Sequence, residues 1–122
     1  NLNELISLLN KPEIIKPQDH LHLYIYLFRN PKSQAKTFAW LTKNWQYVLG
    51  LSGEKTIADY PRYTASAIRT EEMAEKFSDF FGDKREEVAL SRTLKVAEKE
   101  ISARLELIRT DKKAVYDRLK LL

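Results

Sequence analysis

Two histidines, His20 and His22, are the side chains of this 122-residue chain best suited to hold a metal ion. Zinc sites on helices place their histidines four residues apart, so that both imidazoles face the ion. A spacing of two turns the rings about 200° apart on a helix, and the adjacent Asp19 and His20 cannot face one ion there either. The chain has no cysteine, so thiolate ligands are excluded. The spacing favours partly exposed or hydrogen-bonded histidines, and we predict neither a metal ligand nor a cofactor in this segment.

Nucleophile chemistry has no complete motif in the chain. A G-x-S-x-G turn is absent, and only three glycines are present, none of them in a phosphate-binding loop. The paired carboxylates Glu71-Glu72 and Glu86-Glu87 each stand where a helix is expected to begin, and the helix dipole stabilises acidic residues there. We therefore predict no catalytic residue.

The segment Asp59-Tyr60-Pro61-Arg62-Tyr63 is the one candidate binding group, because it brings an arginine and two phenols to a helix start. A guanidinium offers a two-pronged donor to a carboxylate, and the first amides of a helix add further donors. In the alternative interpretation the tyrosines pack, while Arg62 covers them or pairs with Asp59. Arg62 is the candidate substrate-binding residue on the first interpretation.

Charge and hydropathy set limits on the partners of the chain. Its 21 basic and 17 acidic residues give a formal charge of +4, and the signs alternate, as in the i,i+4 pair Glu100 and Arg104. Nucleic-acid binders concentrate lysine and arginine on one surface, so we expect no nucleic-acid partner. No apolar run approaches the length of a membrane span, so no membrane association is expected either. The absence of cysteines and the absence of a secretory signal favour a cytoplasmic location.

Helices must position these side chains. Phe38, Leu41, Trp45 and Val48 recur at helical spacing, and we predict one helix that carries both tryptophans from a Ser33 cap to about residue 49, with Gly50 as its stop. The remaining predicted helices cover residues 2–9, 17–29 and 61–68, then 71–81 with Thr70 as its cap and Gly82 as its stop. A long helix from about 86 and a short last one capped by Asp111 follow. The run 21–28 alternates in part like a strand, but it lies between a proline start and the Asn30-Pro31 stop.

The predicted fold is all-α, with about seven or eight helices in a single domain over residues 1–122. Short connections make successive helices antiparallel neighbours, which indicates helix pairs stacked as a HEAT- or armadillo-like superhelix. No strict sequence period is present, so the repeat would be structural only. A closed helical bundle is the competing architecture.

The order of several short motifs resembles the C-terminal helical domain of aminopeptidase N-type zinc aminopeptidases, the gluzincin aminopeptidase family. The motifs are Lys16-Pro17-Gln18-Asp19, Asn30-Pro31, Ala39-Trp40-Leu41, Asn44-Trp45, Ile68-Arg69-Thr70-Glu71 and Phe80-Phe81. The resemblance covers nearly the whole chain and is closest between residues 15 and 81.

The resemblance implies a division of labour within a larger zinc-dependent enzyme. In that family a zinc held by HExxH and a distant Glu hydrolyses the N-terminal peptide bond, and a Gly-x-Met-Glu-Asn motif holds the free amine of the substrate. Neither motif occurs here, so no catalytic residue carries over and the fragment alone should be inactive. The chain would be a C-terminal superhelix that encloses the substrate chamber, with the rest of the parent chain and peptide substrates as its partners. Arg62 would touch the distal part of a peptide.

A free-standing HEAT-like protein-interaction module is the alternative function. Such an adaptor should have polar helices at both ends, whereas a domain cut from an enzyme should leave apolar ends. The chain starts at Asn1 without an initiator methionine, and both ends carry leucines, which favours the fragment. These leucines are Leu2, Leu5, Leu8, Leu9, Leu119, Leu121 and Leu122.

Overall fold

The computed structural model describes residues 1–121, and every regular element within them is a helix, which confirms the all-α prediction. The helices are α1 (Leu2–Ser7), α2 (Pro17–Arg29), α3 (Gln34–Lys43), α4 (Trp45–Leu51), α5 (Asp59–Ala67), α6 (Glu71–Phe81) and α7 (Ser91–Lys120), with 3-10 turns at Leu8–Asn10 and Gly82–Lys84. The partly alternating run 21–28 is helical, as expected. The HEAT-like stacking and the single-domain boundary stay predictions, and Leu122 lies outside the described residues.

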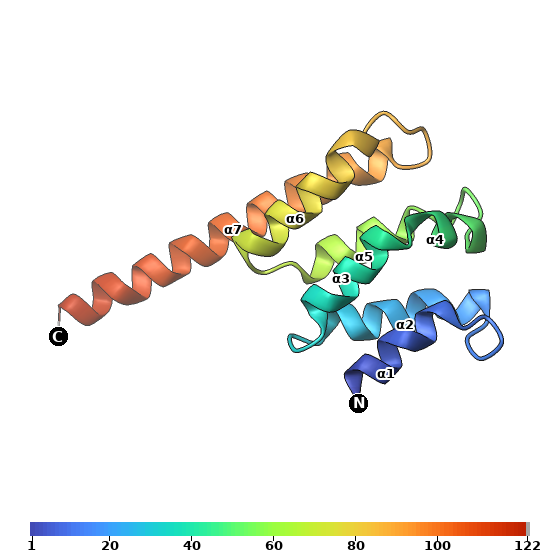
Figure 1. Cartoon of the computed structure of the whole chain (residues 1–122). Helices are drawn as coiled ribbons and strands as arrows, with labels where there is room; N and C mark the ends of the chain where they lie inside the picture. The colour runs from blue at the N-terminus through green and yellow to red at the C-terminus, as the bar shows by residue number, and fades with distance from the viewer. Residues whose placement is uncertain (122) are drawn as a thin grey trace.

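The helices form a body from which the last one projects (Figure 1). Helix α2 packs against α3 and α5, while α7 packs against both α5 and α6. Because a helix rises 1.5 Å per residue, the 30 residues of α7 span about 45 Å. Its C-terminal half therefore extends past the end of the body, as Figure 1 shows. Across residues 1–121, no helix combines the length and the apolar character needed to cross a bilayer.

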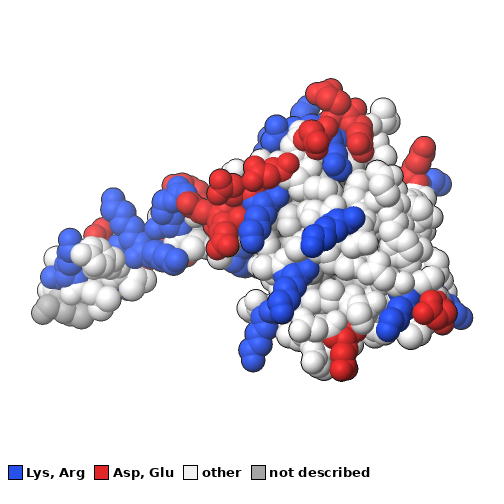
Figure 2. All heavy atoms as spheres, in the orientation of Figure 1, with Lys and Arg blue, Asp and Glu red and all other residues white. Residues whose placement is uncertain are grey.

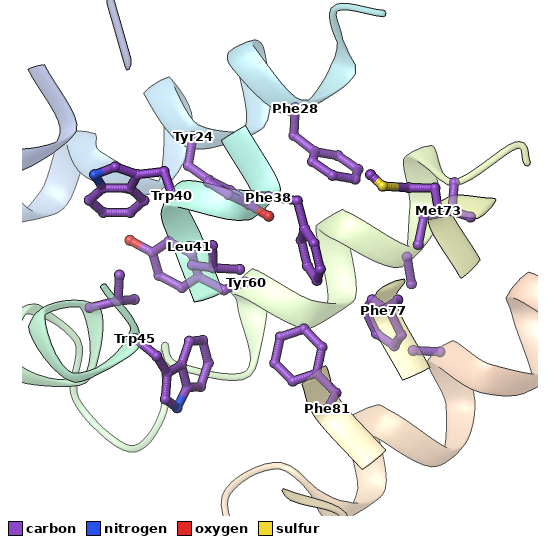
Figure 3. Packing of buried hydrophobic residues seen from close by; sticks show 14 of the residues in the cluster. Tyr24, Phe28, Phe38, Trp40, Leu41, Trp45, Tyr60, Met73, Phe77 and Phe81 are labelled. Carbon is purple, nitrogen blue, oxygen red and sulfur yellow. The ribbon is translucent and has the colours of Figure 1, made fainter. Parts of the chain in front are cut away.

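Aromatic side chains from α2, α3, α4, α5 and α6 fill the core of the body (Figure 3). Phe38, Leu41, Trp45 and Val48 are all buried, so the predicted apolar face is confirmed. Burying one side chain of this size stabilises a fold by about 1.5–3 kcal/mol, because its apolar surface leaves water. The aromatic cluster is therefore the main stabilising feature of the body.

The prediction of one continuous tryptophan helix is wrong, because the helix breaks at Asn44. This residue has non-helical backbone angles, and its side-chain amide donates to the Trp40 carbonyl at 2.8 Å. Asparagine side chains compete in this way for the carbonyls that a continuing helix needs. The break sends the two indoles in different directions: Trp40 contacts His20, while Trp45 packs edge-on against Phe81.

Two predicted helix ends are also corrected. Ser33 precedes α3, but its hydroxyl donates to the Leu27 carbonyl at 2.6 Å and does not cap the new helix. Gly50 lies inside α4, which ends at Leu51. The predicted Thr70 cap is confirmed, since its hydroxyl accepts from the Met73 amide at 3.2 Å, and α6 ends before Gly82 as expected.

Helix starts in the second half differ from the prediction as well. Helix α5 begins at Asp59 and not at Pro61, which sits in the first turn, where the missing amide of proline costs nothing. Helix α7 begins at Ser91 and not near Glu86. The predicted short last helix is not a separate element, because Asp111 lies within α7. No glycine or proline stands between Ser91 and Asp111 to end the long helix before it.

Candidate functional site

Arg62, the candidate binding residue, lies on the exposed side of α5 and is held by two neighbours. Its Nη2 donates to Asp59 Oδ1 at 2.7 Å, and its Cζ lies 4.8 Å from the centre of the Tyr63 ring. The side chain is still 58% exposed. The alternative interpretation, pairing with Asp59 and cover of a tyrosine, therefore describes the arrangement seen here, while guanidinium donors remain accessible for a ligand.

Beside Arg62, a groove of about 880 Å³ runs between α2 and α5. Arg62 itself stands at its rim, because its two contacts, Asp59 and Tyr63, line the groove. The opposite wall comes from α2 and the turn after it. Its lining residues there are Leu21, His22, Ile25, Tyr26, Arg29, Asn30 and Pro31.

A second hollow of about 580 Å³ continues the groove towards the C-terminal end of α5. The two share Arg29 and Pro31, and the second adds Gln34, Ser66 and Arg69 among its lining residues. Arg29 and Arg69 are both exposed, and Arg69 donates to the Ser66 and Ile68 carbonyls. The combined groove is thus lined by Arg29 and Arg69, with Arg62 beside it, and Asp59 is the single acidic residue among its described lining residues. Such a surface suits an extended ligand with hydrogen-bond acceptors, such as the carbonyl and carboxylate groups of a peptide.

Sequence reasoning missed the α2 side of this groove. His22, Tyr26 and Arg29 are spaced i, i+4 and i+7, which places them on one face of α2. That spacing was readable in the sequence, but the apolar positions 24, 27 and 28 dominated the pattern. What the sequence did not reveal is that α5 lies alongside this face.

The histidines have separate roles. His20 is 1% exposed and its two ring nitrogens are both hydrogen-bonded, to the Leu9 carbonyl through Nε2 at 2.9 Å and to the Tyr60 hydroxyl through Nδ1 at 2.8 Å. A carbonyl only accepts, so Nε2 carries the proton, and Nδ1 accepts from Tyr60. Burial lowers the pKa of His20, so the ring is neutral in the folded chain. His22, by contrast, is exposed in the groove.

Buried tyrosines complete this polar network. The Tyr24 hydroxyl lies 2.6 Å from Thr64 Oγ1, which in turn lies 2.7 Å from the Tyr60 carbonyl. Since that carbonyl can only accept, Thr64 donates to it and Tyr24 donates to Thr64. Burial raises the pKa of Tyr60 to about 12 and that of Tyr24 further. The two hydroxyls thus join α2 to α5 as neutral hydrogen-bonding groups.

The residues that the structure describes do not bring together the donor set of a zinc site. Among residues 1–121, no group of three His, Cys, Asp or Glu side chains comes close enough to bind a metal. The paired carboxylates lie on the surface: Glu71, for example, is exposed and paired with Arg109. No reaction step is therefore assigned to a metal on this chain.

The charge distribution is mixed. On the visible face, acidic and basic side chains lie next to one another along the projecting helix, and the body carries scattered charges on a largely uncharged surface (Figure 2). The ion pairs Arg85–Glu98 and Arg104–Glu100 are part of this pattern. The view gives no support to the continuous basic track that a nucleic-acid partner requires.

Comparison with known proteins identifies the family to which this all-helical chain belongs. The chain belongs to the ERAP1-like C-terminal domain family, whose model matches residues 1–103. No solved structure gives a significant match.

Curated relatives carry the name aminopeptidase N. That of Lactococcus lactis subsp. cremoris strain MG1363 is 33% identical over 113 residues, which cover 92% of this chain and 13% of the relative. That of Lactobacillus helveticus is 30% identical over 106 residues, covering 86% of the chain and 13% of the relative. That of Lactobacillus delbrueckii subsp. lactis is 25% identical over 111 residues, or 90% and 13%. The chain thus spans about an eighth of the length of the relatives that it matches. The resemblance noted in the sequence is confirmed.

Proposed function

We propose that this chain is the non-catalytic C-terminal helical part of a zinc-dependent aminopeptidase, where it encloses the substrate chamber and limits access to it. The observation that carries the proposal is the family match over residues 1–103, together with relatives named aminopeptidase N. The small share of each relative that the chain covers is consistent with a part of a longer enzyme.

Zinc and the hydrolytic residues belong, in this proposal, to the rest of the parent chain. The described residues offer no three-ligand group, and the sequence lacks both HExxH and Gly-x-Met-Glu-Asn. The contribution of this chain is then shape and charge. A helical wall restricts the chamber to unfolded peptides, because a folded protein cannot pass between packed helices.

The groove between α2 and α5 is the surface that we assign to the chamber side. Arg62 stands at its rim with 58% of its side chain exposed, and Tyr63 beside it offers an aromatic face. A peptide whose N-terminus is held at the distant zinc could reach this rim with its distal residues. Contacts so far from the bond that is cleaved stabilise the bound substrate and the transition state equally, so they affect KM and leave kcat unchanged.

Substitution of Arg62 in the full-length enzyme tests this role. Arg62→Ala should raise KM about fivefold, mainly for short peptides, as expected for loss of one contact worth about 1 kcal/mol, while kcat stays the same. The matched control is Arg109→Ala, because Arg109 is 60% exposed and also paired with a carboxylate but lies on α7. If Arg62→Ala and Arg109→Ala gave the same KM across peptide lengths, Arg62 would not touch substrate.

A free-standing HEAT-like interaction module is the alternative function, and the exposed apolar residues on the second half of α7 count against it, because an adaptor should end in polar helices. The open reading frame decides between the two. A frame that encodes HExxH upstream of Asn1 supports the enzyme, and a start codon directly before Asn1 supports the adaptor. The cytoplasmic location stays a prediction under either function.

A further inference from the structure

One apolar stripe runs along the whole of α7. Residues 90, 94, 97, 101, 105, 108, 115 and 119 of the chain are all leucine, isoleucine, valine or alanine. At 100° per residue, they fall within an arc of about 80° on the helix. The stripe therefore faces one direction from the start of α7 to its end.

Only the first half of this stripe is covered. Leu94 and Ile101 are buried against the body at 0% and 5% exposure, whereas Val115 and Leu119 are 57% and 61% exposed. The neighbours end near Arg109, which pairs with Glu71 in the first turn of α6. Beyond that point α7 stands alone (Figure 1). The exposed residues thus continue an interface that is already formed, and they point towards the layer occupied by α5 and α6.

The charges beside the exposed stripe indicate what could cover it. Residues 109–120 hold five basic and two acidic side chains, and Lys112 stands in line with the stripe itself. A second copy of this helix would bring two basic surfaces together, which is unfavourable. An amphipathic helix with aspartate or glutamate beside its apolar face would complement both features.

We propose that the second half of α7 is the docking site of a helix from the part of the parent aminopeptidase chain that lies outside these 122 residues. That helix continues the α5–α6 layer along α7, buries Val115 and Leu119, and places an acidic side chain opposite Lys112. The proposal rests on the proposed function, and it is supported by the relatives, of which this chain covers about 13%.

Two leucines of equal exposure on different faces make a matched pair for the test. Leu119 lies in the stripe at 61% exposure, and Leu107 lies about 120° away from its centre at 62%. Leu119→Gln and Leu107→Gln are made in the full-length enzyme and in the 122-residue chain. Glutamine keeps the helix propensity and adds no charge near the helix terminus. Amide hydrogen exchange in residues 106–120, thermal unfolding and sedimentation are measured, with aminopeptidase activity as a separate readout.

In the full-length enzyme, Leu119→Gln should speed exchange in residues 106–120 about 10- to 100-fold, as expected when a buried leucine is lost from a locally opening helix, while Leu107→Gln leaves it unchanged. In the 122-residue chain neither variant should alter exchange, because both leucines are exposed there. Equal exchange of the two variants in an active full-length enzyme would overturn the docking site and leave the proposed function intact. Dimers of the 122-residue chain that Leu119→Gln dissociates would overturn it in favour of a second copy. Absence of any encoded peptidase domain would instead overturn the proposed function.

Discussion

The two halves of α7 carry the same sequence pattern but lie in different surroundings. In the first half the apolar stripe is buried against α5 and α6, and in the second half it faces solvent. The periodicity of a helix thus specifies which face is suited to burial, while the presence of a neighbour decides whether it is buried. The second half also shows that a long helix needs tertiary contacts over only part of its length to remain a single helix.

Two arginines of α7, Arg104 and Arg109, show the same difference in surroundings between its two halves. In the first half, Arg104 Nη1 donates to the Ala65 and Ile68 carbonyls at 2.7 and 2.9 Å, which satisfies the open end of α5. In the second half, Arg109 pairs with Glu71 and Glu106 on the surface. Water competes for such exposed pairs, so they stabilise the fold little. Burial therefore converts the same side chain from a surface charge into a structural connection between two helices.

The largest expected contrast between the two halves comes from shortening their leucines in the 122-residue chain. Leu94→Ala removes a fully buried side chain and should lower the free energy of unfolding by about 2–5 kcal/mol, because it leaves a cavity. Leu119→Ala should change it by less than about 0.5 kcal/mol, since that side chain is exposed. Urea unfolding followed by circular dichroism measures both. A similar loss for the two variants would mean that the second half of α7 is packed in solution.

The arginine pair should give a smaller contrast. Arg104→Ala leaves two carbonyls at the end of α5 without their donor and should cost about 2 kcal/mol. Arg109→Ala removes only exposed ion pairs and should cost less than about 0.5 kcal/mol. The same urea titrations, repeated at 1 M salt, separate the two, because salt weakens the exposed pairs and leaves the Arg104 hydrogen bonds in place. Equal losses would show that Arg104 does not hold α7 to α5.

Most of the helices could be predicted from the sequence, since apolar spacing and terminal signals coincide in them. Pro17 and Thr70 begin their helices as expected, and Phe38, Leu41 and Val48 are buried as expected. The errors occurred where side chains make non-local or competing bonds. Asn44 breaks the tryptophan helix by bonding to Trp40, and Ser33 bonds back to α2. Such choices depend on which partner is close in space, which a sequence pattern does not contain.

The candidate site was predictable only in part, for a related reason. Arg62 was found because it shares a short segment with its partners Asp59 and Tyr63. The other wall of the groove comes from α2, about thirty to forty residues earlier in the chain, and only the packing of α2 on α5 brings His22 and Tyr26 there. A spacing of two residues likewise did not reveal that His20 is buried and that His22 is exposed.

The two histidines offer the finest comparison between interior and surface. His20 is neutral in the folded chain because burial lowers its pKa, whereas in the unfolded chain it titrates near the ordinary value of 6.5. As pH falls below 6.5, the unfolded state therefore binds a proton that the folded state does not, and the free energy of unfolding declines. His20→Gln should reduce this decline below about pH 6.5, and His22→Gln, a substitution on the exposed surface, is the matched control. Urea unfolding at each pH gives the slopes, and a nuclear magnetic resonance titration of His20 in the unsubstituted chain checks the cause should His20→Gln fold poorly. A His20 ring that titrates at 6.5 or above in the folded chain would contradict the prediction, because the bonds to Leu9 and Tyr60 would then hold a charged imidazole.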